Sequence, residues 1–515
     1  MPNVITYIAK SLWPDDVTLR QERFYLFLSA ALLALAWPPL PFGFLAHIAL
    51  IKPLDIISGK SFGKGFKQGY FFYFFYACFS LYWIAWVTVP GTLAAIAITS
   101  LYPAFIFGLY AAVYRWKKIA GLIALPFLWV GMEYFRTQLE IAFPWSNLSY
   151  TQGSYLPLLQ ICEFVGDVGL SFLIVVINIL LWQTWKQRRA VYAIAAGLLV
   201  IIPVIYGSIV LNKADKPDSG PLTIALLQGG LTIDEKWDPK NRDYNFFLYD
   251  SLAMAAVHDT SEGKVRFVSW PETSAPAYLI ENYRLTALVK RTARRIGVPM
   301  LVGTLDYTGI PPDSIETFNA AFQFDPDGSY REPYHKSKLV PFAETVPYGN
   351  YIPWLANLSL GWSDFVHGRG PVVFKNDFGN YGTLICYEVI FPEVVNEYVR
   401  QGADFLVNIT NDAWYGYSSG PYQHAGMAPF RAIENRICIA RATNSGFSYF
   451  TDRYGRIYNK LGLFKKGYIT GHIQPVEGKT LFNRTGPIIG QIGLLIIGIV
   501  SCILGIAWIK RRLPS

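Results

Sequence analysis

The sequence predicts a bundle of apolar membrane helices joined to a globular α/β domain, and three observations support this fold class. Hydrophobic residues make up 52% of the 515 residues and charged residues only 16%, which is too apolar for a soluble enzyme. Long apolar runs occur before residue 211 and after residue 486. Between about 220 and 480 they give way to short strand-like runs separated by polar turns, as expected of a globular domain.

Six apolar stretches approach or exceed the length needed to cross a bilayer as helices. They lie at about 69–89, 92–114, 119–135, 169–185, 190–210 and 487–509. A further stretch, from Phe24 to Ile51, is broken by the prolines of WPPLP (37–41), which cannot continue a helix. Because basic residues lie on both sides of this stretch, both flanks should be cytoplasmic, and we expect a short hairpin of two segments. The sequence therefore predicts eight membrane segments.

Basic residues follow every second segment of this arrangement. They are Arg115, Lys117 and Lys118 after the fourth, Lys186, Arg188 and Arg189 after the sixth, and Lys510, Arg511 and Arg512 after the eighth. The positive-inside rule then puts both chain ends in the cytoplasm and the segment between Leu211 and Thr485 on the outer side. Much of the +9 net charge is therefore a topology signal, and we expect no nucleic-acid partner. The first apolar stretch begins late and lacks a small-residue cleavage site, so we expect no cleavable signal peptide.

We expect three regions along the chain. Residues 1–215 form an N-terminal bundle of seven segments, 216–482 a globular catalytic domain, and 483–515 a C-terminal membrane helix. In the globular region, five apolar runs predict strands covered on both faces. They are LTIALLQ (222–228), VRFVSW (265–270), MLVGTLD (300–306), TLICY (383–387) and DFLVNIT (404–410). DPDG (325–328) and DRYG (452–455) indicate two hairpins, and the whole suits one α/β domain with a mixed sheet.

Polar residues stand just beyond several of these strands, where ligands bind in open α/β sheets. Glu272 follows the second run, Cys386 ends TLIC, and Asn411 and Asp412 follow the fifth run. Each has an ordinary explanation when taken alone, since a carboxylate there often caps a turn and an isolated cysteine is usually inert packing. Lys336 lies in the loop YHKSKLVPFAE (334–344). A carboxylate, a lysine and a cysteine are nevertheless the base, the oxyanion cation and the nucleophile that thiol acyl transfer needs.

The cysteines and histidines do not suggest a metal. The five cysteines have no CxxC spacing, which argues against zinc, a redox pair and a disulfide framework. The six histidines are scattered singly, without an HExxH helix. We expect no metal and no cofactor.

Four motifs together resemble the nitrilase superfamily, whose members use Glu, Lys and Cys in that order. They are SWPETSAP (269–276), YHKSKLVPFAE (334–344), CYE (386–388) and NITNDAWYG (408–416). With the membrane segments, FPWSNLSYTQ (143–152) and GPYQHAGMAPFRAIENR (420–436), nearly the whole chain is similar to the apolipoprotein N-acyltransferase family.

The resemblance implies an α-β-β-α sandwich and an acyltransferase of the bacterial inner membrane, with its catalytic domain on the periplasmic face. The implied donor is phosphatidylethanolamine or a related phospholipid, and the acceptor is the amine of a diacylglyceryl-cysteine apolipoprotein, in the last step of lipoprotein maturation. Carried over by position, Glu272 is the general base, Lys336 assists the oxyanion with the Tyr387 backbone N–H, and Cys386 forms a thioester in a ping-pong reaction. A monomer suffices.

The family pattern also marks supporting residues. Glu344 would orient Lys336 or the acceptor amine, and Tyr387 and Glu388 would shape the pocket around the nucleophile. Trp237, in DEKWDP, matches a substrate-binding position, although ordinary packing explains an aromatic equally well. A nearby cation and a helix beginning at Cys386 would each favour its thiolate.

Other features keep two interpretations each. Ala343 stands where the family pattern has glycine, which costs stability only if that position needs a positive φ. The loop 348–370 is a packed cover or a mobile lid, and lipid substrates favour the lid. Glu133 and Arg136, near the end of the fifth segment, form an interior ion pair or contact a lipid head group.

Three other functions stay open at this stage. A membrane-tethered amidase or nitrilase would resolve the thioester with water and release ammonia from simple amides. A binding or transport protein would carry a catalytically dead domain, and a purely structural role would leave Glu272, Lys336 and Cys386 coincidental. Undiminished function after Cys386→Ala would support either of the last two.

Overall fold

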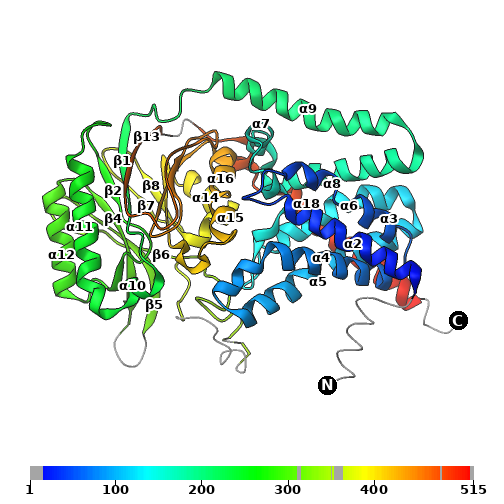
Figure 1. Ribbon diagram of the computed structural model, residues 1–515, viewed down its shortest axis with the longest axis horizontal. Coiled ribbons are helices and arrows are strands. Elements are labelled where there is room, and N and C mark those ends of the chain that lie inside the picture. The colour runs from blue at the N-terminus through cyan, green and yellow to red at the C-terminus, as the bar shows by residue number, and fades with distance from the viewer. Residues whose placement is uncertain (1–15, 310–314, 350, 353–363, 476–477, 511–515) are drawn as a thin grey trace. The chain divides into compact units, whose positions relative to one another are not determined.

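The computed structural model describes residues 16–309, 315–349, 351–352, 364–475 and 478–510 (Figure 1). The chain divides into two compact units. The first runs to Leu139 and includes Pro144–Ser208 and the chain from Pro487 on. The second comprises Glu140–Phe143 and Ile209–Gly486. The domain boundaries expected from the sequence stay a prediction, and most of the loop expected to be a lid lies outside the described residues.

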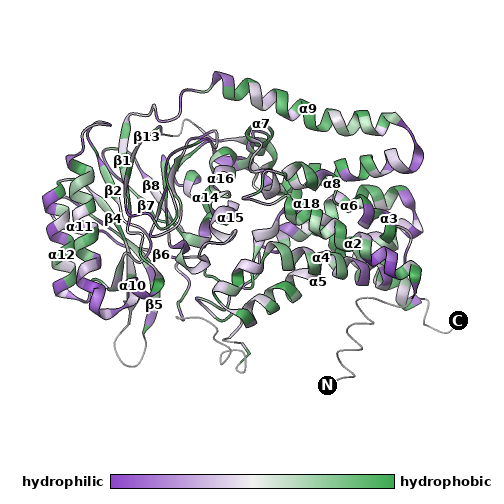
Figure 2. Cartoon of the chain, viewed as in Figure 1, coloured by the Kyte–Doolittle hydropathy of each residue, from purple (hydrophilic) through white to green (hydrophobic). Residues whose placement is uncertain are grey.

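The first unit is helical. Its elements are α2 (Val17–Leu35), η1 (Gly43–His47), α3 (Ile51–Ile57), α4 (Phe62–Ser80), η2 (Tyr82–Trp86), α5 (Val89–Trp116), α6 (Lys118–Phe135), η3 (Pro144–Ser146), η4 (Leu148–Gln152), α7 (Leu156–Leu159), α8 (Cys162–Gln187), most of α9 (Ala190–Lys213) and α18 (Ile488–Lys510). Among the described residues, five helices are long and apolar enough to cross a membrane: α5, α6, α8, α9 and α18. Figure 2 shows hydrophobic residues along them.

The expected count of eight membrane segments is not confirmed. The first two turns of α2 contain Arg20, Glu22 and Arg23. Helix α4 begins at Phe62 rather than near residue 69, and so it includes two lysines. These polar turns lower the hydropathy of both helices, so neither reaches the composition of a membrane span. The number of crossings therefore stays a prediction.

The stretch from Phe24 to Ile51 differs from the expected hairpin of two spans. Helix α2 ends at Leu35. Between it and α4, the described chain forms only η1 and the seven-residue α3, which is about 10 Å long. The side-chain oxygen of Asn178 accepts from the Leu50 N–H at 2.9 Å, and its nitrogen donates to the Ala46 carbonyl at 2.8 Å. Asn178 of α8 thus satisfies backbone groups that the broken helix leaves without helical partners, as an apolar environment requires.

Glu133 and Arg136 are both buried inside the first unit. An oxygen of Glu133 accepts from the Trp129 indole at 3.0 Å and from the Leu148 N–H at 2.9 Å. Arg136 donates to the side chain of Asn147 at 2.8 Å. These protein partners favour the interior interpretation over a lipid head group, because both side chains fasten the turn that follows α6.

The second unit contains two mixed sheets. Within the described residues the first sheet has the order β13-β1-β2-β4-β5-β6, with β3 also paired to β4. Its strands are β13 (Gly467–Ile473), β1 (Leu222–Gln228), β2 (Phe267–Ser269), β4 (Met300–Thr308), β5 (Glu316–Phe324), β6 (Tyr334–His335) and β3 (Ala275–Tyr278). The second sheet has the order β12 (Ile457–Leu461), β11 (Ser448–Thr451), β10 (Cys438–Thr443), β9 (Phe405–Thr410), β8 (Tyr381–Ile385) and β7 (Val373–Phe374).

Helices cover the outer face of each sheet, which gives the expected α-β-β-α order of layers (Figure 1). Helices α11 (Arg242–His258) and α12 (Tyr283–Ile296) lie on the first sheet, and α14 (Pro392–Arg400) and α16 (Ala428–Asn435) lie by the second. The sheets face each other through aromatic contacts such as that between Phe267 and Tyr381, whose ring centroids are 4.8 Å apart. The remaining elements are α10 (Ile233–Trp237), η5 (Pro239–Asn241), η6 (Cys386–Ile390), η7 (Asp412–Tyr415), α15 (Gly420–Ala425) and α17 (Leu481–Thr485).

The strands coincide with the apolar runs of the sequence. The five predicted runs contain β1, β2 and β9 and most of β4 and β8, and both predicted hairpins join antiparallel strands. Strands β8, β9 and β10 are parallel neighbours, so their carboxyl ends meet at one edge of the second sheet. Strand β8 ends at Ile385, which places Cys386 just beyond that edge.

Candidate active site

Cys386 directly follows β8 as the first residue of η6, in a strained turn. Its backbone φ is +50°, in the left-handed region that side chains other than glycine rarely adopt. The side chain is only 7% exposed. A backbone of this kind, held by the packing around it, projects a side chain away from the strand direction, as nucleophile-bearing turns do.

Glu272 and Lys336 meet beside this turn. The ammonium of Lys336 lies 3.7 Å from Glu272 Oε1 and donates to Glu344 Oε1 at 2.8 Å. The amide of Asn319 on β5 donates to the same Glu272 oxygen at 2.8 Å and to Glu344 at 3.3 Å. Lys336 is also held through its backbone, since its N–H donates to the Asn319 carbonyl at 2.9 Å. The result is one buried cation between two carboxylates.

Burial and neighbouring charges shift the pKa values of the three central groups. Burial opposes the charge of Lys336, but the carboxylates of Glu344 and Glu272 outweigh it and raise the pKa of the lysine. Burial raises the pKa of Glu272, and the charge of Lys336 opposes this rise. Burial also raises the pKa of the Cys386 thiol, and the negative charge of Glu272 raises it further. The nearby cation lowers the pKa of the thiol in the expected direction, but burial and Glu272 together outweigh this effect.

A neutral resting thiol needs a base, and Glu272 is the carboxylate whose field acts on it most strongly. This arrangement is suited to coupled proton transfer and nucleophilic attack, with Lys336 available to a developing oxyanion.

Glu388 connects the turn at Cys386 to the loop that carries Lys336. Its Oε2 accepts from the Ile385 N–H at 2.7 Å, at the end of β8. Its Oε1 accepts from the N–H and hydroxyl of Ser337, both at 2.7 Å, and from the hydroxyl of Tyr334 at 2.5 Å. Since Tyr334 and Ser337 flank Lys336 closely, this buried carboxylate fixes the distance between the lysine and Cys386.

We expect Glu388→Gln to lower the apparent melting temperature of the purified protein by about 5 °C, because an amide nitrogen at either oxygen position faces a donor instead of accepting from it, at a cost of about 2 kcal/mol. Differential scanning fluorimetry measures the change. Glu397→Gln on α14 is the matched control, since Glu397 accepts only a half-exposed bond from Gln401 in the described contacts. Equal melting temperatures for wild type and Glu388→Gln would contradict this role.

Tyr387 packs against the short segment 140–143. Its hydroxyl donates to the Ala142 carbonyl at 2.8 Å, and its ring stacks on Phe143. In the same segment, Glu140 accepts from the Tyr348 N–H at 2.5 Å. Residues 140–143 belong to the second unit although the chain on both sides of them belongs to the first. The side chain of Tyr387, which follows Cys386, is thus held in place by residues from a distant part of the sequence.

A buried group on the parallel-strand edge supports the carbonyl of Cys386. His424 lies 3.3 Å from this carbonyl through Nε2, and its Nδ1 lies 2.8 Å from Asp412. Arg441 on β10 donates to the other oxygen of Asp412 at 3.0 Å. All three side chains are buried, so the strained turn is held by a histidine whose own partners form a buried ion pair.

Sequence comparisons agree with this architecture. Residues 223–480 match the family model of carbon-nitrogen hydrolases, and residues 29–180 match that of the apolipoprotein N-acyltransferase N-terminal domain. Apolipoprotein N-acyltransferase of Geobacter metallireducens is 34% identical over 496 residues, and that of Chlorobaculum tepidum 30% identical over 514. Each alignment covers 92% of this chain and 94% of the relative. The chain belongs to the apolipoprotein N-acyltransferase family.

Membership of this family makes the chain an acyltransferase of a membrane, acting between a lipid donor and a lipoprotein acceptor. Its globular unit is a nitrilase-like α/β domain. Among solved structures, an amidase from Nesterenkonia sp. is 20% identical, with a TM-score of 0.37, and the match covers 52% of this chain and 95% of the amidase. The family assignment is independent of that weak likeness.

Two further residues that the family pattern singled out have definite places. Trp237 ends α10 and is 37% exposed, so its ring is accessible for contact with a ligand. At the departure from the family pattern, the positive φ of 62° falls on Phe342, and Ala343 does not take one. Alanine at this position therefore carries no penalty of left-handed backbone.

Two site residues escaped the sequence reasoning. Asn319 lies inside β5 between Phe318 and Ala320. A polar side chain in a buried strand was the only signal of it in the sequence. Lys236 precedes Trp237 and is 1% exposed, yet a lysine beside two acids in DEKWDP resembles an ordinary surface charge. Their roles became visible only through contacts with Glu272.

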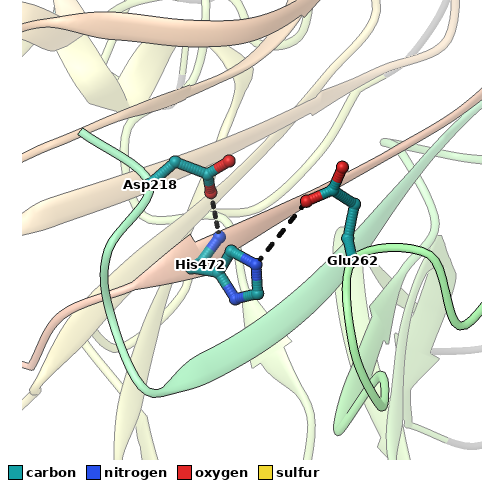
Figure 3. A group of neighbouring side chains, drawn as sticks. All are labelled: Asp218, Glu262 and His472. Carbon is teal, nitrogen blue, oxygen red and sulfur yellow. Dashed lines mark hydrogen bonds and ion pairs between the residues drawn. The ribbon is translucent and has the colours of Figure 1, made fainter. Parts of the chain in front are cut away.

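Among the described residues, Asp218, Glu262 and His472 are close enough together to hold a metal ion (Figure 3). Asp218 already accepts from the His472 N–H at 2.5 Å and from the side chain of Asn459 at 2.8 Å. The Nδ1 of His472 is 3.1 Å from the Thr223 hydroxyl, and Glu262 is half exposed. These bonds explain the group as a network at a sheet edge, and we assign no metal to it.

Proposed function

We propose that Glu272, Lys336 and Cys386 are a catalytic triad that moves an acyl chain from a phospholipid to the amine of a diacylglyceryl-cysteine apolipoprotein. The observation that best supports this proposal is the buried ammonium of Lys336, 3.7 Å from Glu272 and near the strained turn that carries the buried thiol of Cys386. Membership of the acyltransferase family supplies the class of donor and acceptor.

In the first half-reaction Glu272 takes the proton of Cys386 as the sulfur attacks the ester carbonyl carbon of the donor. The carbonyl oxygen becomes an oxyanion, which Lys336 and the backbone N–H of Tyr387 stabilise. When the intermediate collapses, the ester C–O bond breaks, and the leaving alkoxide takes the proton from Glu272. Lysophospholipid departs, and the acyl chain stays on Cys386 as a thioester.

In the second half-reaction the acceptor amine attacks the thioester carbon, again with the oxyanion near Lys336. Glu272 accepts the amine proton, the C–S bond breaks, and the thiolate of Cys386 recovers a proton from Glu272. The products are an amide on the lipoprotein and the free enzyme. The first half-reaction thus acylates Cys386, and the second restores its thiol. Glu344 holds Lys336 for both steps through its 2.8 Å contact.

A phospholipid of the phosphatidylethanolamine type is the proposed donor, and Trp237 the proposed substrate contact. A membrane location suits both substrates, because extracting an acyl chain into water costs about 0.8 kcal/mol per methylene. We place the chain in the bacterial inner membrane as a monomer with eight segments, both termini in the cytoplasm and the catalytic unit on the periplasmic side. The apolar helices and the basic loops support this orientation.

The test uses the full chain in vesicles of phosphatidylethanolamine, with a peptide bearing an S-diacylglyceryl amino-terminal cysteine. We expect one acyl chain to be added to the peptide amine, seen by tandem mass spectrometry, and parallel lines in double-reciprocal plots with two varied substrates. An N-acetylated form of the same peptide is the matched control and should receive no chain. Release of ammonia from simple amides without acylation of the peptide would instead identify a hydrolase.

A further inference from the structure

Lys236 is a second buried lysine beside the proposed catalytic base. It lies on α10 with 1% of its side chain exposed. Its ammonium donates to the backbone carbonyl of Glu272 at 2.9 Å and to the hydroxyl of Thr273 at 2.5 Å. Thr273 has a φ of +44°, so the lysine binds the strained turn that carries Glu272.

Local structure holds Lys236 in place from both sides. Helix α10 begins with a capping box, in which Thr232 and Glu235 bind each other's backbone N–H groups. The carbonyl of Lys236 accepts from the side chain of Asn245 on α11 at 2.9 Å. The lysine therefore reaches the turn at Glu272 from a fixed backbone, and it directly precedes Trp237.

The partners of Lys236 do not by themselves account for a charged side chain. A carbonyl and a hydroxyl are neutral acceptors, and an amide could bind them without the several kcal/mol that burial of an ion costs. Burial lowers the pKa of Lys236 to about 7, while Glu272 and Cys386 oppose this. The ammonium persists to near-neutral pH because the charge of Glu272 opposes the effect of burial.

Charge balance gives the ammonium a function. Glu272 and Glu344 together outnumber Lys336 when both are ionised, and each half-reaction moves one negative charge from Glu272 to the oxyanion without changing this excess. A second cation at the backbone of Glu272 offsets this excess, and it stabilises the ionised form of the carboxyl that must take the thiol proton.

We propose that Lys236 is a positioning residue that holds the Glu272–Thr273 turn in place and whose charge favours the ionised form of Glu272. This inference rests on the proposed role of Glu272 as the base. Lys236 is expected to act through Glu272 and not on the substrate, because its ammonium is enclosed by protein groups.

The direction of the pH effect follows from the groups around Glu272. The charged or titratable groups that act on it or respond to it are Lys336, Glu344, Lys236, Cys386 and Tyr415. Removing one cation raises the pKa of Glu272 further above its ordinary value. The base then ionises at higher pH, so the acid limb of kcat/KM moves to higher pH.

Four variants in full-length protein test the inference with the vesicle assay. Lys236→Met removes charge and hydrogen bonds, Lys236→Gln removes the charge but keeps a donor, and Lys236→Arg keeps the charge. Lys240→Met is the matched control, because Lys240 lies four residues after Lys236 and is exposed. For each variant, kcat, KM and the pH dependence of kcat/KM are measured.

We expect Lys236→Met and Lys236→Gln to lower kcat about 10- to 100-fold with KM nearly unchanged, and to move the acid limb up by about half a pH unit or more. Lys236→Arg should keep the acid limb of wild type, and Lys240→Met should match wild type throughout. Lys236→Gln decides the matter if Lys236→Met does not fold.

An acid limb that is unmoved in Lys236→Gln would overturn the inference, as would a loss of kcat explained by the fraction of folded protein. The proposed function is tested separately by acylation of the wild type. If wild type carries no acyl chain on Cys386, the proposed function fails, whereas an acylated wild type with an unmoved acid limb in the variant rejects Lys236 alone.

Discussion

Cys386→Ala is expected to lower acyl transfer to the lipoprotein peptide on the order of 10³-fold or more, because no other group in the strained turn can form the thioester. The fold should persist, since the loss of one sulfur atom leaves the bonds of Glu388 and His424 to the turn in place. Initial rates in the vesicle assay and melting temperatures of both proteins measure the two effects.

A second cysteine provides the control for that prediction. Cys438 on β10 is also buried, with its pKa raised to about 11 by burial, but it has no place in the proposed chemistry. Cys438→Ala should keep the rate of wild type within about threefold. Transfer by Cys386→Ala at a rate near that of wild type would show that Cys386 is ordinary packing and that the acyl chain travels another way.

Lys336→Met is expected to have the next largest effect, a loss of about 10²- to 10³-fold in kcat, because the oxyanion loses its cation. The substitution also leaves Glu272 and Glu344 facing each other around Asn319 without the charge between them. Removing one partner from a buried charged group typically destabilises a protein by about 3–5 kcal/mol. Both the rate and the melting temperature should therefore fall.

The loss of stability in Lys336→Met should depend on pH in a definite direction. Without the lysine, the pKa of Glu272 in the folded state, which burial already raises, rises further above that of the unfolded chain. A raised folded pKa favours the folded state at low pH and loses that benefit as pH rises, so the deficit should be smaller at pH 5 than at pH 8. Lys338→Met, which removes a partly exposed lysine resting on the ring of Phe391, is the control. A deficit that widens toward acid pH would contradict the proposed contacts.

Local patterns predicted the strands and the order of the motifs well, for a physical reason. Apolar runs such as LTIALLQ are buried on both faces, and β1 spans the same residues, Leu222–Gln228. Parallel pairing of β8 and β9 then places residues after both strands at one edge, which is why Cys386 and Asp412 were visible as candidates.

Properties that depend on depth or on distant contacts were not predictable in the same way. A cation near Cys386 was expected to favour its thiolate, but burial raises the pKa of the thiol, and the depth of a side chain depends on packing that no local pattern reveals. Asn319 and Lys236 reach Glu272 from other elements, and no spacing along the chain reveals such contacts. The broken chain after α2 was not predictable either, because the side chain of Asn178, on the distant helix α8, binds its backbone groups.

The most direct test of the proposed mechanism is the intact mass of the full-length protein after incubation with phosphatidylethanolamine and no acceptor. We expect an added mass of one acyl chain on wild type, removed by hydroxylamine or by the lipoprotein peptide, and absent from Cys386→Ala. A preparation that acylates the peptide yet never carries this adduct, or an equal adduct on Cys386→Ala, would contradict a thioester at Cys386.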